Sequence, residues 1–448
     1  MIDVDIDATG RGAGVTVIGA GYLGLTHAVC LAELGHDVLA VDTDAGKVAQ
    51  AAAGTAPFFE PGLQELLRKQ LDAGRLRFTT SHAEAARFAD IHFLCVGTPQ
   101  APDGSADLSQ VYAAMDALAP YLARPCLIAG KSTVPVGTAR ALAARIAAQA
   151  PAGAGAEVIW NPEFLREGSA VRDSLMPDRI VLGASSQQAA DRLKQVYAEP
   201  IGQGVPVLVM DLETAELVKM SANAFLATRL SFINALAEVC EATGADVAAL
   251  ARALGYDERI GGRFLTPGLG YGGGCLPKDI RAFGTVAAEL GIGSLATLLT
   301  EVDAINMRCR SRTVDLAREM AGGSLAGRRV GVLGVAFKPG SDDVRNSASL
   351  DVCGRLAAEG AVVTVHDPVA LRSAALVRPD LRYAESAVAA AAHADLLLHL
   401  TDWEEYRVID PHVLGAVVAR RNVIDARSAL DEHRWRSAGW SFRALGRP

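Results

Sequence analysis

A glycine-rich turn between two short apolar runs constrains the fold of this chain more than any other feature. Val15–Ile18 is predicted to be a buried strand, and Gly19, Gly21 and Gly24 then open a helix that stops at Gly35. A second apolar run, Val38–Val41, predicts the next strand. A strand, a helix and a strand within about 30 residues are typical of a βαβ unit in a parallel sheet.

The residues of this unit predict a dinucleotide site. The three glycines permit a tight turn, close approach of a pyrophosphate and close packing of helix on strand. The helix N-terminus favours the phosphate charge. Asp42 ends the second strand, and an acid there suits a free ribose diol and repels a 2′-phosphate, so NAD is preferred over NADP. The alternative is a sheet that merely uses tight turns.

The pattern of the rest of the chain predicts three domains in an α/β fold, with two Rossmann-like doubly wound domains joined by a helical one. Residues 213–241 lack glycine and proline and predict one long helix of about 43 Å. The expected domains are residues 1–212, 213–324 and 325–448, with a loose leader at 1–13. Further predicted strands are Ile91–Val96, Cys126–Ala129, Val158–Trp160, Ile180–Leu182, Arg328–Gly334, Val362–Val365, Leu396–Leu400 and Val423–Ile424.

Composition excludes several classes of protein. The 448 residues carry a net charge of −8 and no basic stripe, which argues against nucleic acid as the main partner. The longest uncharged window, residues 12–32, contains five glycines and is a poor membrane span. No secretory signal is visible. Seven cysteines without a Cys-x-x-Cys pair predict a reducing cytoplasm and no metal site.

One cysteine has surroundings that suit chemistry. Cys275 follows a glycine-rich run that starts at Gly270, and Pro277 suits the first helical position after it. A helix N-terminus and nearby cations favour the thiolate, so Cys275 is the candidate nucleophile. The alternative is a small residue that fills a turn. The other six cysteines are expected in the cores.

Two further pairs of polar residues stay ambiguous from spacing alone. Lys219 and Asn223 are four apart, so they share one face of the long helix. Lys219 could be a functional group or a snorkelling surface lysine. Glu163 and Glu167 are also four apart, and they could form a solvated helix edge, bind sugar hydroxyls or activate water.

The succession of motifs closely resembles the UDP-glucose/GDP-mannose dehydrogenase family of nucleotide-sugar dehydrogenases. The matching residues occur in family order and cover almost the whole chain after residue 14. They are Gly19–Gly24, Asp42, Lys47, Phe59–Leu63, Val96–Pro99, Lys131–Pro135, Asn161–Gly168, Lys219–Phe225, Gly270–Asp279, Phe337, Lys338, Arg345 and Asp425–Arg427.

The resemblance implies an NAD-dependent four-electron oxidation of UDP-glucose to UDP-glucuronate. Cys275 would form a thiohemiacetal and then a thioester, which water hydrolyses. Lys219 would stabilise oxyanion charge with help from Asn223, and Asp279 would activate water or take protons, together with Glu163 through a water. Thr133 is a further candidate for placing that water. The alternatives are a sibling enzyme for GDP-mannose or a UDP-N-acetylhexosamine, and a non-catalytic nucleotide-sugar binder.

The resemblance also assigns binding residues and a homo-oligomer. Arg259 matches an arginine that reaches the substrate from a neighbouring subunit, and the long helix resembles the family's dimer core, so at least a dimer is expected. The C-terminal domain would hold UDP. Expected NAD contacts are Gly19, Gly21, Tyr22, Leu23, Gly24, Asp42, Lys47, Val96, Thr98, Pro99, Thr133, Glu167, Lys278 and Arg345. Expected substrate contacts are Glu163, Phe164, Leu165, Lys219, Asn223, Arg259, Gly272, Phe337, Lys338 and Arg427.

Overall fold

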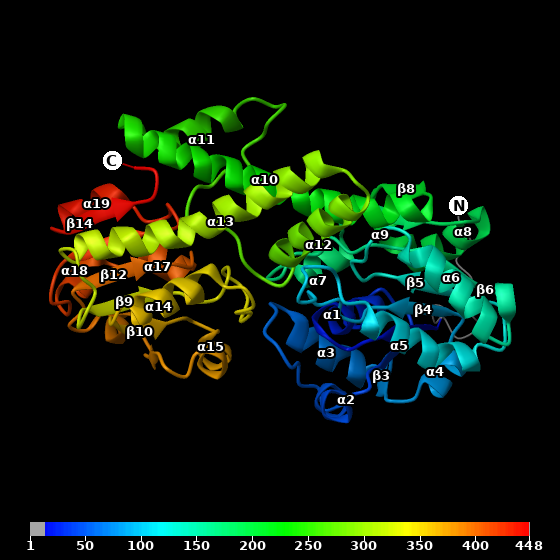
Figure 1. Cartoon of the computed structure of the whole chain (residues 1–448). Helices are drawn as coiled ribbons and strands as arrows, with labels where there is room; N and C mark the ends of the chain where they lie inside the picture. The colour runs from blue at the N-terminus through cyan, green and yellow to red at the C-terminus, as the bar shows by residue number, and fades with distance from the viewer. Residues whose placement is uncertain (1–13, 448) are drawn as a thin grey trace. The chain divides into compact units, whose positions relative to one another are not determined.

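The computed structural model describes residues 14–447, which form two compact units (Figure 1). One unit extends to Ala222 and the other begins at Asn223, so the division falls within a single long helix. The predicted leader at residues 1–13 lies outside the described residues.

The first unit is built on an eight-stranded sheet with the order β3-β2-β1-β4-β5-β6-β7-β8. All neighbouring strands pair in parallel except β6 and β7, which are antiparallel. The first six strands follow the Rossmann order 3-2-1-4-5-6. The strands are β1 Val15–Ile18, β2 Val38–Val41, β3 Leu76–Thr79, β4 Ile91–Leu94, β5 Cys126–Gly130, β6 Ala156–Trp160, β7 Ile180–Gly183 and β8 Val207–Met210.

Helices cover both faces of this sheet, and for this reason its central strands β1, β4 and β5 are buried at every position. In β1, Val15 and Val17 pack into one core cluster and Ile18 packs into another, as the alternation of side chains along a strand requires. The helices are α1 Tyr22–Glu33, α2 Ala45–Ala52, α3 Leu63–Asp72, α4 His82–Phe88, α5 Ser109–Leu118, η1 Ala119–Tyr121, α6 Thr138–Gln149, η2 Gly153–Gly155, α7 Ala170–Leu175, α8 Gln187–Val196 and α9 Ala198–Gly202.

The second unit contains a six-stranded, wholly parallel sheet with the order β11-β10-β9-β12-β13-β14. Renumbered within the unit, this is again the order 3-2-1-4-5-6, so the prediction of a second Rossmann-like sheet is confirmed. The strands are β9 Arg329–Leu333, β10 Val362–His366, β11 Arg382–Tyr383, β12 Leu396–His399, β13 Asn422–Asp425 and β14 Ser441–Ala444.

Long helices precede this sheet. The predicted long helix is confirmed as α10, Leu212–Thr243, with 32 residues. The remaining helices are α11 Val247–Gly255, α12 Leu276–Glu289, α13 Gly293–Met320, α14 Ala348–Ala358, α15 Leu371–Val377, α16 Ala387–Ala391, α17 Glu404–Val408, α18 Pro411–Gly415 and α19 Glu432–Ser437. Across residues 14–447, no helix is long and apolar enough to cross a membrane.

The predicted fold class is confirmed, whereas four strands were missed. These are β3, β8, β11 and β14, which lie at or near the ends of the two sheets. Strand β3 alternates apolar and polar residues, so it lacks the continuous apolar run of a central strand. Strand β8 is an apolar run, Val207–Met210, that was overlooked, and it is only partly buried.

Candidate active site

The glycine turn after β1 has the geometry of a dinucleotide site. Gly19 has a φ of +97°, which disfavours other residues. A Cβ on Gly24 would lie 1.7 Å from the Gly19 carbonyl oxygen, so only glycine permits this packing. A Cβ on Gly21 would meet nothing within 4 Å, which leaves open space at the start of α1. The residues present therefore fit a pyrophosphate at the helix N-terminus.

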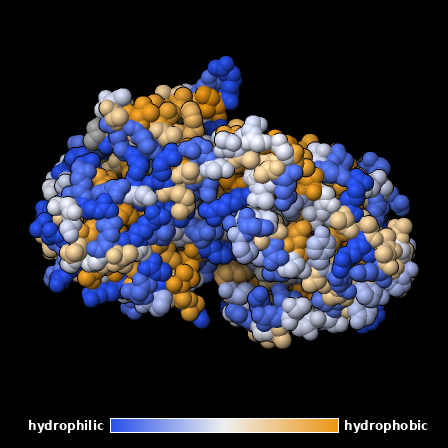
Figure 2. All heavy atoms as spheres, viewed as in Figure 1, coloured by the Kyte–Doolittle hydropathy of each residue, from blue (hydrophilic) through white to orange (hydrophobic). Residues whose placement is uncertain are grey.

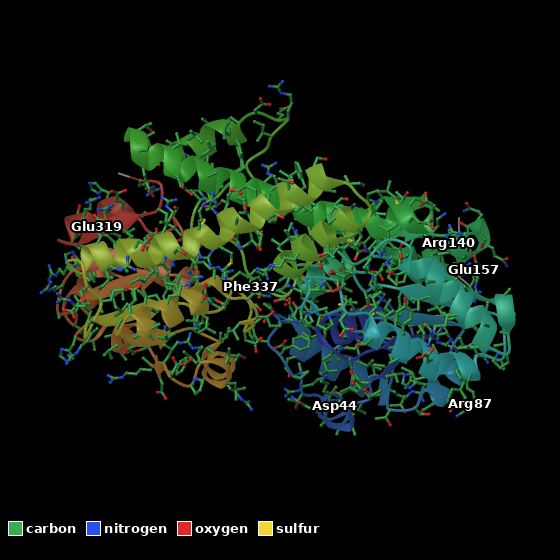
Figure 3. All side chains as sticks on the ribbon, in the orientation of Figure 1. Asp44, Arg87, Arg140, Glu157, Glu319 and Phe337 are labelled. Atoms are coloured by element: carbon green, nitrogen blue, oxygen red, sulfur yellow. The ribbon has the colours of Figure 1, made fainter. Side chains whose placement is uncertain are left out.

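The acid at the end of β2 is fixed by the same turn. Asp42 accepts hydrogen bonds from the Ala20 backbone nitrogen at 2.8 Å and from the Asp44 nitrogen at 2.9 Å. Asp44 in turn caps α2 through the backbone of Gly46 and Lys47, at the position labelled in Figure 3. The Asp42 carboxylate is thus held beside the glycine turn, as binding of a ribose diol requires.

Other expected NAD contacts lie in the loops after β4 and β5. The Thr98 hydroxyl donates to the Thr133 carbonyl oxygen at 2.8 Å. The carbonyl oxygen of Val96 accepts from Ser132 at 2.7 Å. These bonds join two loops at the carboxyl ends of neighbouring strands, where α/β sheets bind ligands. Pro99 and Lys47 are exposed.

Glu60 is a functional candidate to which the sequence analysis assigned no role. Its carboxylate accepts hydrogen bonds from the Tyr22 hydroxyl and from the backbone nitrogens of Gly168 and Ala170, at 2.6 and 2.7 Å to the nitrogens. Burial and this carboxylate raise the pKa of Tyr22. Glu60 lies within the Phe59–Leu63 motif that matches the family, but the motif alone did not indicate a role for this carboxylate.

The segment that contains Glu163 is a loop, so the interpretation as a solvated helix edge is wrong. The Lys219 ammonium lies 3.0 Å from the Glu163 carboxylate, and the two side chains are only 6% and 10% exposed. The Phe164 ring lies 5.6 Å from the same ammonium, and Glu163 also accepts from the Leu165 nitrogen at 2.8 Å. Lys219 is therefore a buried, paired cation and not a snorkelling surface lysine.

A second buried lysine lies near this ion pair. Lys131 donates to the Asn161 side-chain oxygen at 3.0 Å, and that oxygen also accepts from the Tyr197 hydroxyl at 2.7 Å. Burial lowers the pKa of Lys131 to about 8, and the charge of Glu163 partly opposes that shift. Lys131 belongs to the Lys131–Pro135 motif that matches the family, but the spacing of that motif did not indicate that the lysine is buried.

Cys275 differs from the other six cysteines in its environment. It is exposed and directly precedes α12, with Pro277 in the first turn. The other six thiols are buried, as predicted. Burial raises the pKa of five of them to about 11 or 12. Those five stay protonated at neutral pH and are unsuited to nucleophilic attack.

The first turn of α12 also brings together three expected site residues. The Asn223 amide donates to the Asp279 carboxylate at 2.6 Å, in a buried position. The Lys278 ammonium lies 2.5 Å from the other oxygen of the same carboxylate. A carboxylate held by a cation and an amide one turn after the thiol is suited to proton transfer or to orienting water.

The glycine loop before Cys275 is closely covered by residues that follow β9. A Cβ on Gly272 would lie 2.5 Å from the Asn346 carbonyl oxygen, and one on Gly273 would lie 2.7 Å from the ring of Phe337, which Figure 3 labels. A Cβ on Gly274 would lie 2.7 Å from the Arg345 guanidinium. The Lys338 ammonium lies 5.5 Å from the centroid of the Phe337 ring.

The Arg427 guanidinium donates hydrogen bonds to backbone carbonyl oxygens. It donates to the carbonyl oxygens of Leu400 at 2.6 Å and Gly270 at 2.9 Å, and burial lowers its pKa to about 10. Its Nη2 is buried without a partner within the described part of the chain. Arg259, in contrast, is 88% exposed and pairs with Asp257 at 2.6 Å. No cluster of three metal-ligating side chains occurs in residues 14–447.

A Rossmann-ordered sheet with a glycine turn and a fixed acid at the end of the second strand defines an NAD-binding protein. Models of three domains of one family match the chain: the NAD binding domain at residues 13–201, the central domain at 213–308 and the UDP binding domain at 331–432. The chain therefore belongs to the UDP-glucose/GDP-mannose dehydrogenase family.

Individual relatives agree with this assignment. A UDP-glucose 6-dehydrogenase of Pseudomonas aeruginosa is 41% identical, with 96% of this chain and 97% of that protein covered. Another UDP-glucose 6-dehydrogenase, YwqF of Bacillus subtilis, is 38% identical, with 97% of each covered. Among solved structures, a UDP-glucose dehydrogenase of Pyrobaculum islandicum matches with a TM-score of 0.90 and 40% identity, covering 97% of this chain and 98% of that one.

Proposed function

We propose that this enzyme oxidises UDP-glucose to UDP-glucuronate with two NAD per sugar. Relatives named for UDP-glucose are 36% to 41% identical over almost the whole chain. A structure of a UDP-D-ManNAc dehydrogenase is 26% identical, and one of a GDP-mannose dehydrogenase 25%. The observation that carries the proposal of covalent chemistry is the exposed Cys275 at the start of α12, beside the Asn223–Asp279 pair.

NAD, when bound, serves as the hydride acceptor in both oxidations. The glycine turn, Asp42 and the Thr98–Thr133 loops hold it in this proposal, and Glu167, Lys278 and Arg345 contribute further contacts. The first oxidation removes a hydride and the hydroxyl proton from the sugar alcohol, which leaves an aldehyde.

Cys275 then captures the aldehyde. Its sulfur bonds to the carbonyl carbon, the thiol proton is released and the carbonyl oxygen is protonated, which gives a thiohemiacetal. Loss of a second hydride and of the hydroxyl proton gives a thioester. Water adds to the thioester carbon and the carbon–sulfur bond breaks, which releases the carboxylate and restores the thiol.

The polar residues around these steps have distinct roles in the proposal. Lys219 stabilises developing oxyanion charge as a cation, and Asn223 donates a hydrogen bond. Asp279 accepts the proton of the attacking water, with Glu163 and Thr133 placing that water. The substrate is held by Phe164, Leu165, Gly272, Phe337, Lys338 and Arg427.

We further propose three domains with separate roles and at least a homodimer. Residues 1–212 bind NAD, 213–324 form the dimer core and 325–448 bind UDP. The solvent face of α10 supports the dimer, because Phe225, Phe232 and Val239 recur every seven residues and are 63%, 54% and 55% exposed. Apolar side chains also gather at the surface over α10 and α11 (Figure 2). In the dimer, Arg259 reaches the substrate of the partner subunit.

The test is NADH release by the purified protein on a panel of UDP- and GDP-sugars. We expect two NADH per UDP-glucose and no free aldehyde. Turnover with GDP-mannose or a UDP-N-acetylhexosamine, and none with UDP-glucose, would contradict the substrate. Cys275→Ser should abolish the four-electron oxidation, and the buried Cys353→Ser is the matched control; a normal rate in Cys275→Ser would contradict the covalent role.

A further inference from the structure

The loop before Cys275 is held through its main chain by residues from distant parts of the sequence. The Gly268 nitrogen donates to Asn234 of α10 at 2.8 Å, and the Leu269 nitrogen donates to the Ala426 carbonyl oxygen at 2.7 Å. Main-chain anchoring of this kind fixes where the loop backbone runs, independently of the loop's own side chains.

Asn306 of α13 makes the most complete of these contacts. Its side-chain oxygen accepts from the Tyr271 nitrogen at 2.7 Å, and its amide donates to the Tyr271 carbonyl oxygen at 3.1 Å. Asn306 is 1% exposed, so no water competes for either bond. Gly270 has a φ of +87°, and a Cβ there would lie 2.3 Å from the Asn306 oxygen, so the loop backbone is seated directly on this amide.

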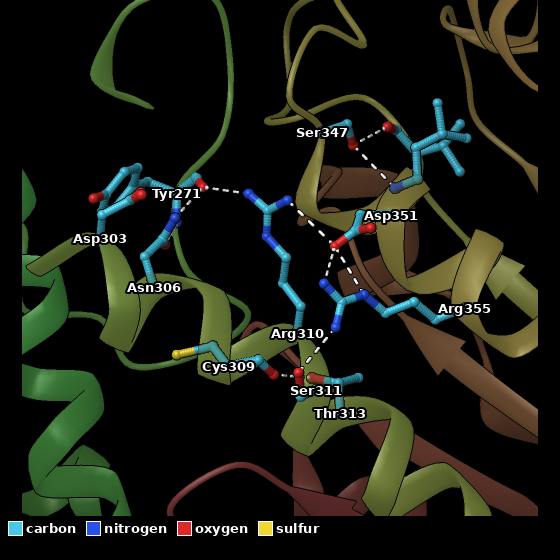
Figure 4. A network of polar contacts seen from close by, with 12 residues as sticks. Tyr271, Asp303, Asn306, Cys309, Arg310, Ser311, Thr313, Ser347, Asp351 and Arg355 are labelled. Carbon is cyan, nitrogen blue, oxygen red and sulfur yellow. Dashed lines mark hydrogen bonds and ion pairs between the residues drawn. The ribbon is translucent and has the colours of Figure 1, made fainter. Parts of the chain in front are cut away.

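A charged network that begins at Arg310, one helical turn after Asn306, also contacts the Tyr271 backbone (Figure 4). Arg310 donates to the Tyr271 carbonyl oxygen at 3.4 Å and lies 3.4 Å from the Asp351 carboxylate of α14. Arg355 lies 3.0 Å from that carboxylate and donates to Ser311 at 2.9 Å. The network thus ties α13 to α14 on the side where Asn306 meets the loop.

We propose that Asn306 is a positioning residue for the Cys275 thiol. By fixing both backbone groups of Tyr271, four residues before Cys275, it sets where the loop enters α12 and so keeps the thiol at the helix N-terminus. This placement favours the thiolate. The inference rests on the proposed nucleophilic role of Cys275 and not on the identity of the sugar.

The test compares Asn306→Ala and Asn306→Asp with Thr313→Val in the full chain. Thr313 is a matched control because it is a buried polar residue of the same helix, and its hydroxyl donates within that helix, to the Cys309 carbonyl oxygen at 2.8 Å. Alkylation of the folded protein by iodoacetamide, followed by mass spectrometry of the Cys275 peptide, reports the thiol without any substrate. Steady-state kinetics then report turnover.

For Asn306→Ala we expect kcat to fall about 10- to 100-fold, because small misplacements of a reacting group have such effects. Alkylation of Cys275 at pH 7 should slow by about five-fold or more, and the rise of the alkylation rate with pH should shift to higher pH. The KM for NAD should stay within about two-fold of the wild-type value. Asn306→Asp retains the acceptor for the Tyr271 nitrogen and should be intermediate. Thr313→Val should resemble the wild type.

Alkylation and kcat within about two-fold of wild type in Asn306→Ala would overturn the inference, as would an equal loss in Thr313→Val. If Asn306→Ala does not fold, Asn306→Asp decides by the same criteria. A wrong substrate would leave the alkylation result unchanged. Full turnover of Cys275→Ser would instead contradict the nucleophile on which the inference rests.

Discussion

Removal of the Lys219 charge should destabilise the first unit, because it leaves the Glu163 carboxylate buried. At their separation of 3.0 Å, two unit charges attract by about 5 kcal/mol at an effective dielectric constant near 20. Breaking a buried pair by removing one partner typically costs about 3–5 kcal/mol. We expect Lys219→Met to lower the free energy of unfolding by about 3 kcal/mol, at the low end of this range, because the nearby Lys131 charge also interacts with Glu163.

Neutralising both partners should restore most of that loss. In Lys219→Met/Glu163→Gln no buried charge is left without its partner, and we expect stability within about 1 kcal/mol of wild type. The assay is urea unfolding of the full chain followed by circular dichroism, for the wild type, both single variants and the double variant. The resulting cycle isolates the pairwise coupling, which we expect to be about 2–3 kcal/mol.

The matched control is an exposed ion pair of the same unit. Lys69 lies 2.6 Å from Glu33, and the side chains are 56% and 25% exposed. The same cycle with Lys69→Met and Glu33→Gln should give a coupling below about 1 kcal/mol, because solvent screens the pair. A coupling between Lys219 and Glu163 no larger than that of the exposed pair would refute the reasoning.

Three further predictions test other parts of the chain. Gly24→Ala should weaken NAD binding and destabilise the fold, because its Cβ would lie 1.7 Å from the Gly19 oxygen. Gly21→Ala places its Cβ in open space, so it should weaken NADH binding in a fluorescence titration without loss of stability. Equal stability of the two variants would contradict this prediction. Burial raises the pKa of Glu216 from 4.5 to about 7, so the folded chain retains a proton that the unfolded chain releases between these values. Stability should therefore fall by about 3 kcal/mol as the pH rises through this window, and unfolding of Glu216→Gln should lack that component; an unchanged pH profile would contradict it. Phe232→Glu should shift the mass measured by light scattering toward the monomer, and an unaltered oligomer would argue against α10 as the dimer face.

Local sequence patterns were sufficient for much of the fold. Strand β1, the glycine turn and helix α1 follow from apolar periodicity and glycine spacing within one short segment, and the length of α10 follows from the lack of glycine and proline. The edge strand β3 was not predictable in this way, because Arg77 and Thr79 interrupt its apolar pattern, whereas the apolar run of β8 was present in the sequence and was overlooked.

The sequence by itself also determined the start of α12 after Cys275, because a glycine run followed by proline is a local signal of a helix start. Only the tertiary structure decided the partners of the charged and amide groups. Asn223 and Asp279 are 56 positions apart, and Asn306 meets Tyr271 across 35. Burial of a charge and the choice of its partner depend on which distant segments pack together, and spacing along one helix or loop carries no information about that packing.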